Sequence, residues 1–369
     1  MRIAADWLAA PETQAVCAML LAGGRQALFV GGCVRNALMG RPVADIDIAT
    51  DARPDQVMAL AEAAGLKPVP TGVAHGTVTV VAGNRPFEVT TFRRDVETDG
   101  RRAKVAFTDE IAEDAARRDF TMNALYARPD GVVVDPLGGL PDLRAGLVRF
   151  VGDPAARIAE DRLRILRFFR IHAWYGDPAG GLDPDGLAAC AAACEGLATL
   201  SRERVGAEMT KLLAAVLPGA DPRALAPLVH LEAETGASPR WQRRLLALGW
   251  QPDWATRLRL SRADVRALTE AAAALAAGEP PAAAAWRHGT DAARDSALVG
   301  AASLGTAPPA RLEGEIARGA AARFPLAAAA LGREGRDLGR AMKRLEAAWL
   351  ASDFGLTAAE LADLDRAEG

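Results

Sequence analysis

Two aspartates separated by one residue, Asp45 and Asp47, are the side chains whose type and spacing most directly suggest chemistry. On a β-strand, residues i and i+2 project to one face, so both carboxylates would converge while Ile46 and Ile48 face a core. Paired hard oxygen ligands suit Mg²⁺, which typically binds one or two carboxylates together with substrate phosphates. We therefore expect Asp45 and Asp47 to be catalytic metal ligands, although acidic pairs at strand ends are also common without a metal.

A glycine pair precedes these aspartates and opens a short helical stretch. Gly31 and Gly32 follow a strand-like segment at 27–31, where a backbone without side chains can offer its N–H groups to a phosphate. Arg35, one turn later, would supply positive charge to the same anion. This is not a Walker loop, because no Gly-Lys-Ser/Thr follows, and a tight turn is the simpler alternative. Together with the aspartates, the glycines outline a nucleoside triphosphate site.

A second cluster lies at 157–170, where five arginines face two acids. In a helix predicted over 158–172, Asp161 and Arg164 are neighbours at i and i+3. Cytosine and adenine both present an amino donor beside a ring-nitrogen acceptor, so this pair would hold either base and mispair with guanine or uracil. Each buried mispaired group would cost about 1–3 kcal/mol.

Arg167 and Arg170 continue this row at three-residue spacing. Because the row drifts around a helix, they would fan out along an elongated ligand such as a triphosphate. An exposed, salt-bridged helix face is the alternative interpretation.

The elements that must position these residues are a few strands followed by many helices. The valine- and threonine-rich stretches predict strands at 27–31, 45–50, 77–82, 86–92 and 132–134, with a turn at 83–85 and helices at 11–22, 35–39 and 54–64. There are too few regular βα repeats for a doubly wound parallel fold. From residue 155 to the end, the composition is almost entirely that of helices.

Composition narrows the protein class. A chain of 369 residues accommodates two or more domains, and a net charge of −3 means that any RNA-binding charge must be concentrated locally. No apolar run approaches the roughly 20 residues of a membrane span, and the first residues do not read as a signal peptide, so we expect a cytoplasmic protein. The cysteines, with Cys190 and Cys194 one turn apart, and the scattered histidines make a zinc site or a histidine-based phosphohydrolase improbable.

Four segments resemble one known family in order along residues 28–172. They are VGGCVRNALMGRPVADIDIAT; GVAHGTVTVV followed by FEVTTFRRDVETDGR; EDAARRDFTMNALY; and AEDRLRILRFFR. They are similar to the motifs of class II CCA tRNA nucleotidyltransferases and bacterial poly(A) polymerases, in the DNA polymerase beta-like superfamily. The resemblance implies an α+β fold, a small mixed-sheet nucleotidyltransferase head followed by an all-helical neck, body and tail. The expected domains are a head at 1–150, a neck with the nucleotide-selecting helix at 151–235, and an RNA-binding body and tail at 236–369.

The resemblance also implies an activity. It is the template-independent addition of CMP and AMP to the 3′ end of tRNA, with CTP and ATP as substrates, Mg²⁺ as cofactor, the tRNA acceptor end as partner and no protein partner predicted. A poly(A) polymerase, or an enzyme adding only C or only A, is the nearest alternative. A noncatalytic RNA-binding module is a third. Arginine clusters such as 240–244 or 333–344 are candidates for phosphate contacts.

By the same resemblance, Arg118 is a nucleotide-binding arginine that Asp119 would organise. Glu88 is a candidate third carboxylate, with pairing to an arginine as the equal alternative. Residues 93–108 correspond to a mobile loop, although an exposed hairpin would look the same, and His75 is expected to be structural.

Two residues depart from the family pattern. Asn36 stands where an aspartate is usual, and Arg162 stands where a small residue is usual. Neither position touches the expected metal ligands.

Overall fold

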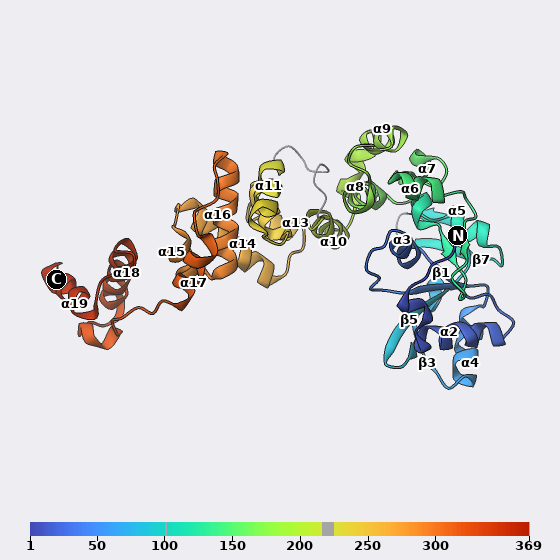
Figure 1. Cartoon of the computed structure of the whole chain (residues 1–369), viewed down its shortest axis with the longest axis horizontal. Coiled ribbons are helices and arrows are strands. Elements are labelled where there is room, and N and C mark those ends of the chain that lie inside the picture. The colour runs from blue at the N-terminus through green and yellow to red at the C-terminus, as the bar shows by residue number, and fades with distance from the viewer. Residues whose placement is uncertain (100–101, 216–224, 369) are drawn as a thin grey trace. The chain divides into compact units, whose positions relative to one another are not determined.

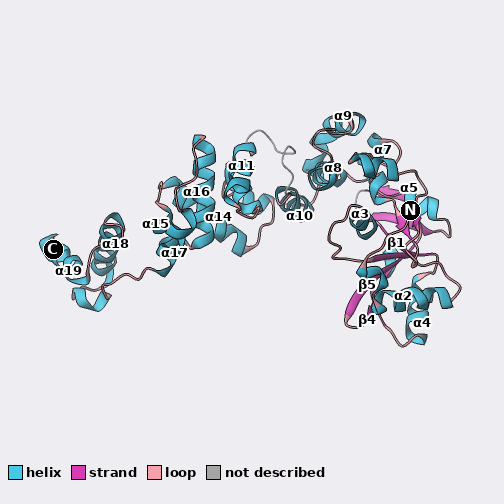
Figure 2. Cartoon of the chain, in the orientation of Figure 1, coloured by secondary structure: helices cyan, strands magenta, loops and turns pink. Residues whose placement is uncertain are grey.

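The computed structural model describes residues 1–99, 102–215 and 225–368, and the chain divides into two compact units, Met1–Ala220 and Asp221–Gly369 (Figure 1). Figure 2 shows the strands in the first unit, whereas the described part of the second consists of helices and loops. The predicted α+β fold, a mixed-sheet head followed by helices, is thereby confirmed. The predicted limits of head, neck, body and tail stay predictions.

The head is built on a seven-stranded sheet in the order β3-β4-β5-β2-β1-β8-β9. Its strands are β1 (Leu28–Val30), β2 (Asp47–Thr50), β3 (Lys67–Gly72), β4 (Thr77–Ala82), β5 (Arg85–Thr91), β8 (Tyr126–Ala127) and β9 (Val133–Val134). Strands β2 and β5 run parallel, and the other paired strands of this sheet are antiparallel. The strands predicted from the sequence all occur, with their ends shifted by at most two residues.

Two residues with positive φ explain the turn between β4 and β5. Gly83 (φ 56°) and Asn84 (φ 63°) connect the paired residues Ala82 and Arg85, which is the preferred chemistry of a two-residue hairpin. The predicted turn is confirmed. The sequence does not predict β3, because prolines at 68 and 70 interrupt it, and proline is tolerated in a strand only at a sheet edge such as this one.

One face of the sheet is covered by helices α2 (Pro11–Ala22) and α4 (Pro54–Ala63), which pack on β3, β4 and β5. Alternate strand residues point to opposite faces, so the residues between the buried ones project from the other face. Asp47 and Glu88 are two of these. The strand residues fully buried in this core include Ile48, Val78, Val80, Phe87 and Val89.

Shorter elements complete the head. They are α1 (Asp6–Ala9), α3 (Gly32–Leu38), α5 (Ile111–Ala116), α6 (Leu140–Ala145) and the 3₁₀ turns η1 (Val73–His75) and η2 (Thr121–Asn123). The segment expected to be a mobile loop or an exposed hairpin forms a separate two-stranded sheet of β6 (Arg93–Asp99) and β7 (Arg102–Phe107). Its tip at 100–101 lies outside the described residues.

Helices continue the first unit beyond the head. They are α7 (Pro154–Glu160), α8 (Leu163–Tyr175), α9 (Pro184–Ala193), the 3₁₀ segment η3 (Cys194–Thr199) and α10 (Arg202–Leu213). The single helix predicted over 158–172 is wrong, because Asp161 is extended (φ −152°, ψ 105°) and separates α7 from α8. The Asp161 side chain accepts the Leu163 N–H at 3.1 Å, a local bond with which aspartate competes against helical continuation.

A cluster of three phenylalanines attaches α8 to the head. Phe150 lies 4.9 Å from Phe120 and 5.4 Å from Phe168 of α8, measured between ring centroids. All three side chains are buried, so the contact gains apolar burial as well as ring geometry. The helix that follows Asp161 is therefore packed directly against the head.

The described part of the second unit contains the remaining helices. They are α11 (Ala226–Thr235), α12 (Trp241–Ala247), α13 (Trp254–Arg257), α14 (Arg262–Ala276), α15 (Pro281–His288), α16 (Thr290–Leu304), α17 (Leu312–Ala321), α18 (Gly335–Ala351), α19 (Ala358–Glu368) and the 3₁₀ turn η4 (Ala328–Leu331). Trp349 of α18 contacts Trp286 of α15 at 5.4 Å between ring centroids, and this contact ties the last helices to the rest of the unit.

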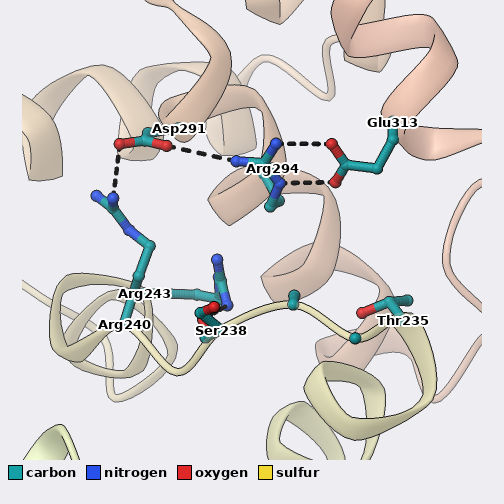
Figure 3. A pocket seen from close by; sticks show the side chains of 9 residues that line it. Thr235, Ser238, Arg240, Arg243, Asp291, Arg294 and Glu313 are labelled. Carbon is teal, nitrogen blue, oxygen red and sulfur yellow. Dashed lines mark hydrogen bonds and ion pairs between the residues drawn. The ribbon is translucent and has the colours of Figure 1, made fainter.

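A buried ion-pair network joins three helices of the second unit. Arg243 is 1% exposed and binds Glu232 of α11 and Asp295 of α16, both at 2.8 Å. Arg244 binds the other oxygen of Glu232 at 2.9 Å. Figure 3 shows the neighbouring surface, where Arg240 contacts Asp291. The arginines at 240–244 are thus committed to carboxylates of their own unit, so they are weaker candidates for RNA phosphate contacts than the sequence indicated.

This network generates a stability prediction. Arg243→Met should lower the free energy of unfolding by about 3–5 kcal/mol, because it leaves buried carboxylates without their counter-charge. Urea unfolding of the full chain measures it, with Arg257→Met as the control at a side chain that is 71% exposed. Equal stability of the two variants would contradict a structural role for the network.

Candidate functional site

The expected metal ligands lie at the edge of β2. Asp47 is the first residue of β2, and Asp45 is exposed two residues earlier, before the strand begins. The buried residues Ile46 and Ile48 alternate with them, so the predicted division into an acidic face and a core face holds. Asp47 is in parallel register with Glu88 of β5, which brings a third carboxylate to the same face.

The charges of these carboxylates act on one another. Burial and, next, the charge of Glu88 raise the pKa of Asp47 to about 6, Asp45 adds to the rise, and Arg118 opposes it. Glu88 is exposed and forms no ion pair within the described residues, so the alternative of a glutamate paired with arginine finds no partner there. The site therefore gathers more negative charge than the protein itself neutralises.

The glycine turn leads directly into α3. Gly31 has φ 73°, a conformation that strongly favours glycine, and its N–H donates to the Leu125 carbonyl at 3.2 Å. A Cβ at position 31 would lie 3.6 Å from Nη1 of Arg118. Gly32 begins α3 and is partly exposed, as a phosphate-binding backbone would need to be. The turn thus brings the start of α3 beside Arg118.

Arg118 is held by Asp114 and Tyr126. Its Nη2 donates to Asp114 at 2.8 Å and its Nε to the Tyr126 hydroxyl at 3.0 Å. Burial alone would raise the pKa of Asp114, but Arg118, Arg117 and the tyrosine hydroxyl hold it at about 2. Asp114, not Asp119, therefore organises Arg118, and this corrects the expectation from the sequence.

Asp119 instead connects the head to α8. It accepts two hydrogen bonds from Arg167, from Nε at 2.9 Å and from Nη2 at 2.5 Å. Its other oxygen accepts from the Phe120 N–H at 2.9 Å and from Asn123 Nδ2 at 3.0 Å. Burial would raise the pKa of Asp119, yet Arg167 and these donors lower it.

The two expected base-reading residues have separate partners. Asp161 accepts from Arg204 of α10 at 2.6 Å, and Arg164 donates to Glu160 at 2.5 Å and to the Arg157 carbonyl at 2.7 Å. The helix break at 161 means that they are not neighbours on one helix face. Their proposed joint reading of a base stays a prediction.

Further polar residues around the site are not predicted by the sequence. Arg170 binds Glu208 of α10 at 2.5 Å. Glu208 lies four residues after Arg204, on the same face of that helix. The spacing of Arg204 and Glu208 at i and i+4 is a pattern that could have been recognised in the sequence. The helix α10 that carries them lies only about thirty to fifty residues beyond the residues they contact. Asn123 and Glu160 carried no such signal.

Arg35 and His75 differ from simple surface ligands. Arg35 is buried, and its guanidinium contacts Asn36, Asn123 and the ring of Tyr175. His75 is exposed, and its carbonyl, not its ring, accepts a hydrogen bond from Arg93. Whether Arg35 also binds phosphate stays a prediction.

No group of three or more His, Cys, Asp and Glu side chains among the described residues is arranged so that it could hold a metal ion. A metal at Asp45 and Asp47 would thus need further ligands from substrate or water, as Mg²⁺ commonly does. No described helix combines the length and apolar character needed to cross a membrane.

The raised pKa of Asp47 predicts a pH-dependent stability difference. Unfolded Asp47 ionises near its ordinary pKa of about 4, and folded Asp47 only near pH 6, so the wild type loses stability as pH rises between these values. Asp47→Asn should therefore melt at a higher temperature than wild type at pH 8, with the gain vanishing below about pH 4.

Melting curves in a chelating buffer between pH 4 and pH 8 test this prediction. Asp55→Asn, at an exposed residue of α4, is the matched control. A gain for Asp47→Asn that grows towards acid would contradict the charge crowding.

Comparison with known proteins agrees with this architecture. Residues 27–149 match the family model described as the poly A polymerase head domain. The chain is 44% identical over 186 residues to the human mitochondrial CCA tRNA nucleotidyltransferase 1, covering 50% of this chain and 43% of that protein. It is 40% identical over 238 residues to the CCA-adding enzyme of Geobacillus thermodenitrificans, covering 62% and 55%. The chain thus spans about half the length of the curated relatives it matches.

A solved structure is similar along nearly the whole chain. The Bacillus stearothermophilus CCA-adding enzyme, crystallised in complex with CTP, aligns with a TM-score of 0.75 and 29% identity over 97% of this chain and 98% of that one. The matched head contains the glycine turn, both aspartates and Arg118. Through this head, the chain is similar to the poly A polymerase head domain and to the CCA-adding enzymes named above.

Proposed function

We propose that this protein adds CMP and AMP to the 3′ end of tRNA without a template, by Mg²⁺-dependent nucleotidyl transfer from CTP and ATP with release of pyrophosphate. The observation that carries the proposal is the crowding of Asp45, Asp47 and Glu88 on one sheet face, beside Arg118 and the glycine turn. Its cytoplasmic location is part of the same proposal.

The residues at this edge fit a divalent cation. A half-buried Asp47 whose pKa is raised by neighbouring carboxylates would be relieved of repulsion by a bound cation. The oxygen donors match the preference of Mg²⁺. When bound, Mg²⁺ would activate the RNA 3′-hydroxyl and support the departing pyrophosphate.

The triphosphate would lie between the glycine turn and the arginines. Gly32 offers backbone N–H groups at the start of α3, and Arg118 is fixed with its Nη1 towards Gly31. Arg35, Arg167 and Arg170 would add positive charge along the ligand. Arg167 and Arg170 each keep unused N–H groups beside their carboxylate partners, because a guanidinium has five donors.

Base selection is assigned to Asp161 and Arg164. Arg204 and the Leu163 N–H each occupy one lone pair of Asp161, which leaves acceptor capacity for the amino group of cytosine or adenine. The hydrogen bonds of Arg164 use both Nη1 hydrogens and one on Nη2, so Nε–H and the second Nη2 hydrogen are left for a ring nitrogen. Arg204 and Glu160 would then fix the orientation of the two readers.

A poly(A) polymerase, or an enzyme adding only C or only A, is the second candidate. This candidate is favoured because the family model that matches residues 27–149 is that of the poly A polymerase head domain. A noncatalytic RNA-binding module is disfavoured by the presence of both aspartates. The proposed domains keep their expected limits, with the head at 1–150, the neck at 151–235 and the body and tail at 236–369.

An exposed basic row on α18 is the best candidate for RNA phosphate contacts. Arg336, Arg340 and Lys343 lie at i, i+4 and i+7 and line a shallow hollow with Gly339. Within the described residues, only Arg340 of these pairs with an acid, Asp337. By contrast, Arg333 and Arg344, at the limits of the cluster named from the sequence, both bind Asp365.

The double variant Arg336→Ala/Lys343→Ala should therefore weaken tRNA binding. It should also reduce the slope of log affinity against log salt concentration by the amount that about two phosphate contacts contribute. Filter binding at several salt concentrations measures the slope. Arg257→Ala/Arg366→Ala is the matched control, because it removes two exposed arginines that already pair with acids. Equal slopes for the two double variants would move the RNA contact away from α18.

The catalytic proposal is tested by removing the metal ligands one at a time. Asp45→Ala and Asp47→Ala should each reduce incorporation of labelled CMP and AMP by about a thousandfold or more, since several kcal/mol of charge stabilisation depend on the bound metal. Asp55→Ala should retain the activity. Persistent incorporation in both metal-ligand variants would place the chemistry elsewhere.

A further inference from the structure

Arg35 is a buried cation whose hydrogen-bond acceptors are neutral. Arg35 is only 7% exposed. Nε and Nη2 donate to Asn36 Oδ1 at 3.2 Å and 2.9 Å, and Nη1 donates to Asn123 Oδ1 at 2.5 Å. Arg35 forms no ion pair with any described carboxylate. The charge of Asp119 favours this guanidinium without a direct ion pair. Because a buried charge is costly, a group in direct contact must supply further stabilisation.

The ring of Tyr175 is that group. The guanidinium carbon of Arg35 lies 3.7 Å from the ring centroid, and that of Arg41 lies 5.1 Å from it. The negative face of an aromatic ring attracts a cation, most strongly where water is excluded. Arg41 also donates to the Trp174 carbonyl at 2.6 Å, so the last two residues of α8 are both held by arginines in and just after α3.

We propose that Tyr175 is a positioning residue of the nucleotide site, which stabilises the buried charge of Arg35 and anchors the end of α8 to α3. This inference rests on the proposed function and adds a residue to that site. Tyr175 would act through Arg35 and α8, without touching the substrate itself.

The position of Tyr175 along α8 explains why a second anchor matters. Asp119 holds α8 at Arg167, and Tyr175 holds it eight residues later, about 12 Å along the helix axis. The phenylalanine contact at Phe168 lies next to Arg167, so the contacts at Trp174 and Tyr175 are the ones far enough along the helix to fix its direction. The attachments at Arg167 and Tyr175 both lead back to α3, because Asn123 bonds Arg35 as well as Asp119.

Loss of the Tyr175 ring would leave the bond from Arg41 to the Trp174 carbonyl at that end of α8, so the direction of the helix would be less firmly fixed. Arg164 lies on the other side of Arg167, together with the Asp161 turn that precedes α8. Their distance from the carboxylates of β2 would vary, so nucleotide binding and base discrimination would suffer before the chemical step does.

The test compares Tyr175→Leu, which removes the ring face, with Tyr175→Phe, which keeps it. Tyr175→Leu should lower kcat/KM for CTP and ATP about tenfold, mainly through a higher KM, and should increase UTP misincorporation, since a desolvated cation–π contact is worth about a factor of ten or more. Tyr175→Phe should stay close to wild type in kcat/KM.

A second substitution separates this role from simple packing. Asn36→Asp places a carboxylate where Arg35 already donates two hydrogen bonds. If Tyr175 stabilises the charge of Arg35, Asn36→Asp should restore much of what Tyr175→Leu loses, both in KM and in the melting temperature without substrate. The Asn36→Asp single variant corrects for the lost bond to the Pro42 carbonyl.

Equal KM values for Tyr175→Leu and Tyr175→Phe would overturn the proposal, and so would a failure of Asn36→Asp to improve Tyr175→Leu in either measurement. If Tyr175→Leu does not fold, recovery of folded protein in the double variant supports the proposal, and its absence contradicts it. Should the wild type incorporate no nucleotide, the proposed function fails, while the substrate-free melting cycle still decides the contact between Arg35 and Tyr175.

Discussion

Two hydrogen bonds from Arg167 to one oxygen of Asp119 hold the two halves of the proposed site together. The acidic cluster sits on the head sheet, whereas the proposed base readers sit at the start of α8, and this buried carboxylate bridges them. Its burial is tolerated because both oxygens are satisfied, by Arg167 on one side and by Asn123 and the Phe120 N–H on the other. Without it, the phenylalanine cluster, the contact of Arg164 with the Arg117 carbonyl and the end of α8 would have to keep the helix against the head.

The charged residues of the first unit fall into two groups, those that form ion pairs and those that do not. Asp114, Glu160 and Glu208 each bind an arginine and so hold the groups expected to face the substrate. Glu88 and Arg35, in contrast, carry charge without an ionic partner among the described residues, and Asp47 resists ionisation. A protein optimised only for stability would neutralise these charges, and functional sites commonly retain such unfavourable groups. The pattern is what a site for a metal and an anionic nucleotide requires.

Local patterns in the sequence predict the head well. The alternation around Asp45 and Asp47 and the turn at Gly83 and Asn84 depend on neighbours in the chain, so they can be read from it. The break at Asp161 could not be predicted from helix propensity, because propensity does not include the side-chain bond to the Leu163 N–H that accompanies it. The partner of Arg118, Asp114, lies only four residues earlier, so this local pair could have been predicted. The burial of Arg243 could not, because it depends on packing between separate helices. The arginine-rich stretches therefore cannot be distinguished in the sequence. In the structure, the arginines at 240–244 form ion pairs within their own unit, whereas the row on α18 is exposed.

Product analysis on defined RNA ends tests the central claim most directly. The purified protein is incubated with Mg²⁺, all four nucleoside triphosphates and tRNA transcripts that end before CCA, after the first C or after the second C. The account predicts that each transcript is extended only to CCA, with no incorporation of U or G, and that unrelated RNA is not extended. A poly(A) tail on unrelated RNA, or extension by all four nucleotides, would contradict it.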